Sequence, residues 1–305
     1  MDRRSFINKG FLAVAACYGL NSSVFSAIAA NMANVEGFMN KNRIGIQLYS
    51  IREYLPKDFK GSLQKLADIG FAHVEAYGFD GDTFLGKTLK ETSAILNDMG
   101  MKLTSTHCGT GLLPADIQAK EWAYWRKTVQ AMKEAGGKRL VQPWLPAEKT
   151  MDDLKHSAEQ FNKVGEICKN SGLKFGFHNH FGEFKTIDGQ VMLDVLLQNT
   201  DPGLVFFQLD LGHAVNGGVD IRGYLSKYPK RFLSWHASDF KRGQGYTELG
   251  HGDVPYDELF KLAKSYGVAD LIMEHESGED RFDICKRNFD FLAQYSWTKA
   301  KNNLK

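Results

Sequence analysis

The feature that most constrains the fold of this chain is an alternation of short apolar segments with longer amphipathic ones, repeated eight times after residue 43. The short segments have the length and composition of buried β-strands, and the longer ones have the 3.6-residue periodicity of helices with one apolar face. Strict alternation requires parallel strands joined by right-handed crossovers, and eight repeats favour a closed sheet. We therefore predict an α/β fold, a (β/α)8 TIM barrel. The predicted strands are Ile44–Ser50, His73–Tyr77, Lys102–His107, Arg139–Pro143, Lys174–His180, Val205–Asp210, Phe232–His236 and Asp270–Glu274.

The predicted helices carry start and stop signals. One apolar face includes Leu63 and Leu66 and ends before Gly70, a residue suited to a helix C-cap. Thr150, followed three residues later by Asp153, forms a capping pair that begins the fourth helix. The structural alternative is an open, doubly wound sheet. Its nucleotide-binding versions lose support because no G-x-G-x-x-G follows the first strand and no G-x-x-x-x-G-K-[ST] occurs.

Composition and charge limit the partners of the chain. Its 305 residues are 43% hydrophobic, enough to bury the core of a single barrel domain, which we place at residues 43–297. Lys and Arg total 38 against 36 for Asp and Glu, so the chain has no strong positive electrostatic field that would attract nucleic acid or an anionic membrane. The cysteines show no C-x-x-C spacing, which argues against a structural zinc site. We expect a small-molecule partner.

Residues 1–30 are typical of an export signal. Arg3 and Arg4 precede an apolar run, and small residues follow. Residues 3–7 (RRSFI) resemble a twin-arginine signal. Alternatively, residues 14–17 (VAAC) resemble a bacterial lipobox, which would attach a lipid to Cys17. The apolar run is shorter than the ~20 residues that span a bilayer, so we predict no membrane span and a location in the periplasm or, lipid-anchored, in the bacterial envelope.

The fifth to eighth predicted strands each end in a residue type that binds metals. The carboxyl ends of barrel strands surround the active-site mouth, so these side chains should converge. A cation is the simplest partner for two imidazoles and two carboxylates in one pocket. We therefore predict a site for one divalent metal ion: Mn, Zn, Co, Fe or Ni. The four predicted ligands are His178, Asp210, His236 and Glu274.

This pattern resembles the xylose isomerase-like TIM-barrel superfamily, specifically its sugar phosphate isomerase/epimerase branch, over residues 43–295. In that branch a Glu, an Asp, a His and a Glu from strands five to eight hold one metal ion, and Asp210, His236 and Glu274 match the last three. The segment 236–239 (HASD) matches as well. The segment 250–253 (GHGD) resembles a G-x-G-D loop that borders the substrate, which implies a substrate contact for His251.

The first of the four ligands departs from the family pattern. His178 stands where the family has Glu, and Asn179 and His180 follow. His178 and His180 face the same side of a strand but stand roughly 6.6 Å apart, so both need not bind one ion. We assign His178 to the metal and His180 to the substrate or the second shell, with Glu183 as an alternative ligand. A histidine here also removes one base of a paired-glutamate epimerisation.

Further candidates lie near the same strand ends. Glu75 in the second strand, His107 at the end of the third and His213 after the sixth are candidate site residues, and each has a purely structural alternative as a hydrogen-bonding group or a turn residue. Trp144 offers an aromatic face to a sugar ring, or packs in the wall. Lys241, after the seventh strand, is either a substrate contact or part of a solvated turn.

The predicted reaction moves a proton between adjacent carbons. A divalent metal that binds a carbonyl oxygen and a neighbouring hydroxyl stabilises an enediolate, which a carboxylate or histidine can protonate on either carbon. We therefore predict a metal-dependent isomerase or epimerase of a sugar or keto-sugar, with Glu274 as the base and His180 or His107 returning the proton. The alternative is a lyase or hydrolase that cleaves 3-keto-glycosides. An exported enzyme should meet unphosphorylated sugars.

Two other functions have weaker support. The spacing Asp210-x-x-His213 resembles a metal motif of AP endonucleases, which share this barrel, but residues 248–251 (ELGH) stand where an Asp-x-His pair is expected. Near-neutral charge also suits DNA poorly. A non-catalytic sugar-binding barrel would keep the aromatic walls without a tightly bound metal, so metal analysis of the purified protein distinguishes it.

Overall fold

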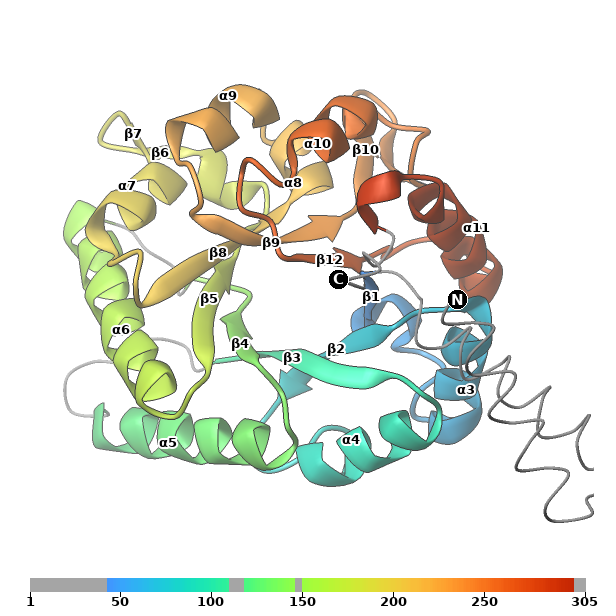
Figure 1. The fold of residues 1–305 in the computed structure, drawn as a ribbon. Helices are drawn as coiled ribbons and strands as arrows, with labels where there is room; N and C mark the ends of the chain where they lie inside the picture. Colours follow the sequence, from blue (N-terminus) through green and yellow to red (C-terminus); the bar gives the residue numbers. More distant parts are fainter. Residues whose placement is uncertain (1–42, 110–117, 146–149, 299–305) are drawn as a thin grey trace, which may run out of the picture. The chain divides into compact units, whose positions relative to one another are not determined.

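Eight parallel strands close into a barrel, as predicted, in the order β1-β12-β9-β8-β5-β4-β3-β2. The computed structural model describes residues 43–109, 118–145 and 150–298, so the predicted export signal and Cys17 lie outside the described residues. Figure 1 shows the strands at the centre and the helices around them. The barrel strands are β1 (Ile44–Gln47), β2 (His73–Phe79), β3 (Lys102–Cys108), β4 (Arg139–Gln142), β5 (Lys174–His178), β8 (Val205–Asp210), β9 (Phe232–Ala237) and β12 (Asp270–Met273).

The helices follow the strands and begin and end at the predicted signals. Gly70 ends the first of them with a φ of 117°, and Thr150 and Asp153 form the predicted capping box. The α-helices are α3 (Phe59–Ile69), α4 (Leu89–Asp98), α5 (Gln118–Glu134), α6 (Met151–Asn170), α7 (Met192–Asn199), α8 (Leu211–Asn216), α9 (Ile221–Lys227), α10 (Tyr256–Leu262) and α11 (Arg281–Ala293), and the 3-10 helices are η1 (Leu48–Ile51), η3 (Gly182–Phe184) and η4 (Ser296–Thr298).

Two short antiparallel hairpins interrupt the alternation, and the sequence pattern did not predict them. One consists of β6 (Thr186–Ile187) and β7 (Gln190–Val191) and lies between β5 and α7. The other consists of β10 (Asp239–Lys241) and β11 (Gly245–Thr247) and lies between β9 and α10. Both hairpins follow the carboxyl ends of barrel strands, so they add to the end of the barrel where the candidate site lies.

The first and fifth strands end earlier than predicted. The first ends at Gln47, whose side-chain oxygen accepts the backbone N–H of Tyr49 and begins η1. The fifth ends at His178 because side chains take over its ladder bonds: Asn179 Oδ1 accepts the N–H of Asp210 at 3.2 Å, and Glu183 accepts the N–H of His180 at 2.8 Å. Asn179 and His180 therefore lie beyond the strand.

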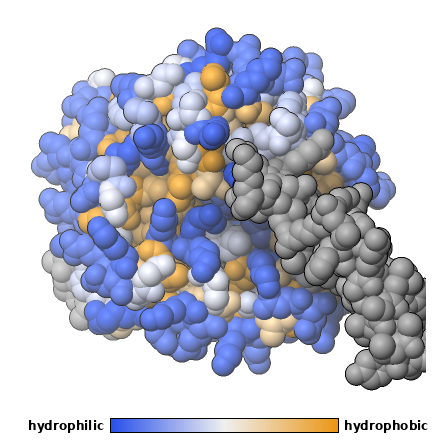
Figure 2. Space-filling model, viewed as in Figure 1, coloured by the Kyte–Doolittle hydropathy of each residue, from blue (hydrophilic) through white to orange (hydrophobic). Residues whose placement is uncertain are grey.

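The apolar core fills the layer between strands and helices. Phe161 of α6 stacks on Phe177 of β5 with ring centroids 5.3 Å apart. Gly176, between two outward-facing phenylalanines, leaves room inside the barrel for Phe206, whose ring would lie 2.5 Å from an added Cβ. Figure 2 shows hydrophilic residues at the periphery, over the outer helices. In the described part of the chain, no helix has the length and apolar character to span a membrane.

Candidate active site

The four predicted metal ligands meet at the carboxyl end of the barrel. The strand register pairs Asp210 with His236, and the N–H of Glu274, one residue after β12, donates to Ala237 O at 3.0 Å. Each of the four ligand residues is buried. One ligand atom from each, including one from His178, lies within 4.8 Å of the others. The structure thus brings together residues from four successive barrel strands.

His236 lies between two carboxylates. Its Nδ1 is 2.8 Å from Glu274 Oε2, and its Nε2 is 2.7 Å from Glu75 Oε1. Burial lowers the pKa of His236, but the charges and hydrogen bonds of Glu274 and Glu75 outweigh burial and raise the pKa to about 10. Burial likewise raises the pKa of Glu274, yet the charge and hydrogen bond of His236 hold that pKa below its usual value. At neutral pH His236 is therefore an imidazolium between two carboxylates, and a metal ion bound here would replace the proton on its Nδ1.

The donor set also fits a divalent metal ion. Burial, and then the neighbouring His236 and His107, hold the pKa of His178 well below its usual value, so its imidazole is neutral. The Nδ1 atom of His178 is buried and has no hydrogen-bond partner. Asp210 Oδ1 accepts the Ser238 hydroxyl and its Oδ2 lies 4.0 Å from His236 Nδ1. A neutral imidazole with a buried, partnerless nitrogen, beside carboxylates, is the chemistry of a metal ligand.

Glu75 lies beneath these ligands rather than at the cavity surface. It is fully buried, and its carboxylate lies within hydrogen-bond distance of five side chains from neighbouring strands. Burial raises its pKa, but the charges and hydrogen bonds of His107 and His236 hold that pKa well below its usual value. A carboxylate bonded to the outer nitrogen of a metal-binding histidine orients the ring. The five partners are Gln47, Ser105, His107, Gln208 and His236.

A cavity of about 320 Å³ is lined by two of the four predicted ligands, His178 and Glu274. Part of its lining is apolar and mostly aromatic, and comes from β2 and from the segments that follow β1 and β4: Tyr49, Tyr77, Gly78, Pro143 and Trp144. The rest of the lining is polar, with His107 from β3 and the others from β5 and the segments that follow β5, β8 and β12: His178, His180, His213, Glu274 and Glu276. Among the described residues, no Lys or Arg lines this cavity.

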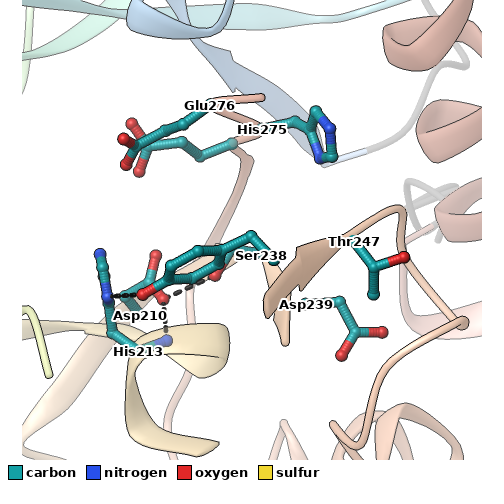
Figure 3. A pocket seen from close by; sticks show the side chains of 9 residues that line it. Asp210, His213, Ser238, Asp239, Thr247, His275 and Glu276 are labelled. Atoms are coloured by element: carbon teal, nitrogen blue, oxygen red, sulfur yellow. Dashed lines mark hydrogen bonds between the residues drawn. The ribbon is translucent and has the colours of Figure 1, made fainter. Parts of the chain in front are cut away.

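A second, small pocket adjoins the ligand set. In Figure 3, Glu276 and His275 lie across this pocket from Asp210 and His213. Tyr246, from β11, places its hydroxyl against Nδ1 of His213. Both pockets share His213, Glu274 and Glu276, so these residues belong to one polar region of the mouth.

The predicted catalytic and substrate-binding residues divide into two groups. His107, His180, His213 and Trp144 line the main cavity with Glu274. Burial, followed by the charge of His213, lowers the pKa of His180 to about 4, so the imidazole of His180 is neutral at pH 7.

Glu75, Lys241 and His251 form the second group and line neither pocket. Lys241 pairs with Asp253 at 2.6 Å, and His251 is exposed in the loop after β11. Their assignment as substrate contacts stays a prediction.

Sequence reasoning missed three residues at the mouth. Glu276 follows Glu274 by two residues, a spacing that could have suggested it. Ser238, which bonds to Asp210 at 2.6 Å, belongs to the HASD segment already singled out. Tyr246 lies on an unpredicted hairpin, so no sequence signal pointed to it.

A closed (β/α)8 barrel with a buried His/Asp/Glu cluster at its carboxyl mouth defines a class of barrel proteins whose mouth carries residues that could hold a metal ion. Comparison with known families identifies the particular group. The sequence profile of the xylose isomerase-like TIM barrel family matches residues 63–296, and the chain belongs to this family. The resemblance found in the sequence motifs is thereby confirmed.

Named relatives include enzymes that act on sugar-like compounds. An inosose dehydratase from Clostridium perfringens is 28% identical over 129 residues, 36% of this chain and 43% of that protein. An inosose dehydratase from Geobacillus kaustophilus is 26% identical over 195 residues, 59% of this chain and 61% of that protein. A crystal structure of a sugar phosphate isomerase/epimerase from Parabacteroides distasonis superimposes with a TM-score of 0.77 at 28% identity, covering 85% of this chain and 96% of that one. Each sequence match spans less than two thirds of the dehydratase concerned.

Proposed function

We propose that this protein is a metal-dependent isomerase or epimerase of an unphosphorylated sugar or keto-sugar. The observation that carries the proposal is the convergence of His178, Asp210, His236 and Glu274 in one buried cluster, two members of which, His178 and Glu274, line a cavity. The buried, partnerless Nδ1 of His178 supports a metal there. When bound, a divalent ion would supply Lewis-acid polarisation of a substrate carbonyl.

The side chains around this point can move a proton between adjacent carbons. Glu274 is ionised at neutral pH, because its pKa is lowered, and lines the cavity, so it can accept a proton from the carbon next to a carbonyl. A histidine, His180 or His107, lines the same cavity and is placed to exchange a proton at the neighbouring carbon. Return of the proton to the other carbon, or to the other face of the same carbon, gives an isomer or an epimer.

The charge of the cavity supports a substrate without phosphate. Its described lining carries the carboxylates of Glu274 and Glu276 and no basic side chain that could pair with a phosphate. The export signal predicted at residues 1–30 leads us to propose that the enzyme works in the bacterial envelope. Sugars there are unphosphorylated, which agrees with the lining of the cavity.

The test is incubation of the metal-loaded protein with free sugars, 3-keto sugars and glycosides in D2O, followed by NMR. We expect deuterium at the carbon that loses the proton and conversion to an isomer. Glu274→Gln should lower turnover by at least about 100-fold, because the base is lost. Glu248→Gln, which changes a surface ion pair to Arg287, is the matched control. Full activity of Glu274→Gln would refute the assigned base.

The relatives favour one second candidate, elimination of water. The first step, abstraction of a proton by the base, is the same. The hydroxyl group on the next carbon then takes up a second proton and leaves as water. This candidate rests on the similarity to inosose dehydratases. The NMR experiment separates the two, because elimination yields an unsaturated or deoxy keto product instead of an isomer.

A further inference from the structure

Exposed aromatic side chains gather at the carboxyl end of the barrel. In the described part of the chain, six large hydrophobic side chains are exposed, and four of them are aromatic. Each of the four lies on a segment that follows the carboxyl end of a barrel strand: Tyr49 after β1, Trp144 after β4, Phe181 after β5 and Tyr246 after β9. The aromatic exposure is therefore concentrated around the candidate site.

Two of these rings belong to the main cavity, and contacts hold the Tyr49 ring in place. Tyr49 packs edge-on against Tyr77 with centroids 5.3 Å apart, and the guanidinium of Arg52 lies 4.2 Å above the Tyr49 ring. The backbone of Trp144 is fixed by a 3.1 Å hydrogen bond from Gln142 to its carbonyl oxygen. Tyr49 and Trp144 remain 36% and 38% exposed. Apolar surface in a cavity that stays open to solvent is typical of a ligand site.

The cavity thus has two chemically different sides. The polar side, at the ends of β5, β8 and β12, holds the candidate base Glu274 with His178, His180 and His213, so the reacting sugar must lie there. The opposite side holds Tyr49, Tyr77 and Trp144 with Gly78 and Pro143, which offer flat apolar faces. Such faces pack on a second ring. Glu276 makes the lining more negative, so a neutral ring fits better than an acidic one.

Building on the proposed function, we propose that Tyr49 and Trp144 form a subsite for the second ring of a glycoside whose first ring reacts at Glu274. The shared chemistry is a neutral ring joined through a glycosidic bond to the reacting sugar. Two sources fit this description: a second sugar and an aromatic aglycone.

The test compares a free sugar, its methyl glycoside, a disaccharide and a phenyl glycoside in steady-state kinetics. Trp144→Ala and, separately, Tyr49→Ala should raise KM about tenfold more for the two-ring substrates than for the free sugar and the methyl glycoside. Trp144→Phe and Tyr49→Phe keep an aromatic ring, so their KM values for the two-ring substrates should stay close to those of the wild type. Leu262→Ala, an exposed position on α10, is the matched control. An effect on the disaccharide alone identifies a sugar as the second ring, and an effect on the phenyl glycoside alone identifies an aglycone.

Two outcomes overturn the subsite: equal KM changes for all four compounds, or no change for any of them. Direct binding by calorimetry keeps this test separate from the proposed reaction. If the wild type turns over no sugar but binds the two-ring compounds more tightly, and Trp144→Ala removes that difference, the subsite stands and the proposed reaction falls. If binding shows no preference for two rings, the subsite falls.

Discussion

His236 is the residue whose partners bear most directly on metal binding. Its Nδ1 faces the ligand set, and its Nε2 bonds to the buried Glu75 at 2.7 Å. Glu75 is held in turn by side chains that include Gln47, Ser105 and Gln208. The carboxylate therefore fixes both the orientation and the tautomer of the imidazole that we assign to the metal.

We expect Glu75→Gln to weaken metal binding by about 10- to 100-fold, because the amide orients His236 less well and adds no negative charge. Competition with a chelator of known affinity measures the dissociation constant. Glu248→Gln should bind as the wild type does. An unchanged affinity in Glu75→Gln would show that His236 needs no support from Glu75, or that the metal binds elsewhere.

At the scale of elements, α6 packs closely on the barrel at Gly165. A Cβ added to Gly165 would lie 2.7 Å from the backbone oxygen of Leu204, just before β8. Backbone atoms cannot rotate away, so this contact sets how near the helix lies to the strand. Two opposed effects meet at this position: alanine favours a helix over glycine, and the added methyl group overpacks the interface.

We expect Gly165→Ala to lower the free energy of unfolding by about 1–2 kcal/mol, since overpacking outweighs the gain of about 1 kcal/mol in helix propensity. Urea denaturation measures the change. Gly223→Ala in α9 is the control, because its added Cβ meets only the side chain of Asp220, which makes no capping hydrogen bond and can turn away. If Gly165→Ala is as stable as the control, α6 can shift outward at little cost.

At the scale of the whole molecule, a buried ionic group joins strands from different parts of the barrel. Asp270 at the start of β12 lies 2.7 Å from Arg139 of β4 and 2.9 Å from His73 of β2. Gly45 of β1 leaves space for His73, since an added Cβ would lie 2.3 Å from its Nε2. Burial raises the pKa of Asp270, but the charges of His73 and Arg139 hold it below its usual value.

Asp270→Asn should lower the free energy of unfolding by about 3 kcal/mol at pH 7, because it leaves the partly buried Arg139 without its carboxylate. The pH dependence has a defined sign. The lowered native pKa means that the contribution is fully present above about pH 4, the usual aspartate pKa, and is lost as the pH falls through the native value. Urea denaturation between pH 3 and 7 should show the difference between wild type and Asp270→Asn narrowing toward low pH. A constant difference would exclude ionisation of Asp270 as the cause.

Some features follow from the sequence because they depend only on chain periodicity and strand polarity. Eight alternating segments predict a parallel barrel, and parallel strands place all their carboxyl ends at one mouth, so His178, Asp210, His236 and Glu274 could be expected to meet. Their convergence needs no knowledge of distances, since register and direction already bring them to one face.

Other features were decided only by the tertiary structure. Glu75 bonds to His236, 161 positions away, and Tyr246 reaches His213 from a hairpin that has no apolar pattern of its own. The end of β5 depends on Asn179 and Glu183, whose side chains replace ladder hydrogen bonds. Tyr49 and Trp144 line one cavity although they follow β1 and β4, which β2 and β3 separate in the barrel. The physical reason is that such contacts depend on barrel closure and side-chain rotamers, which local propensity does not contain.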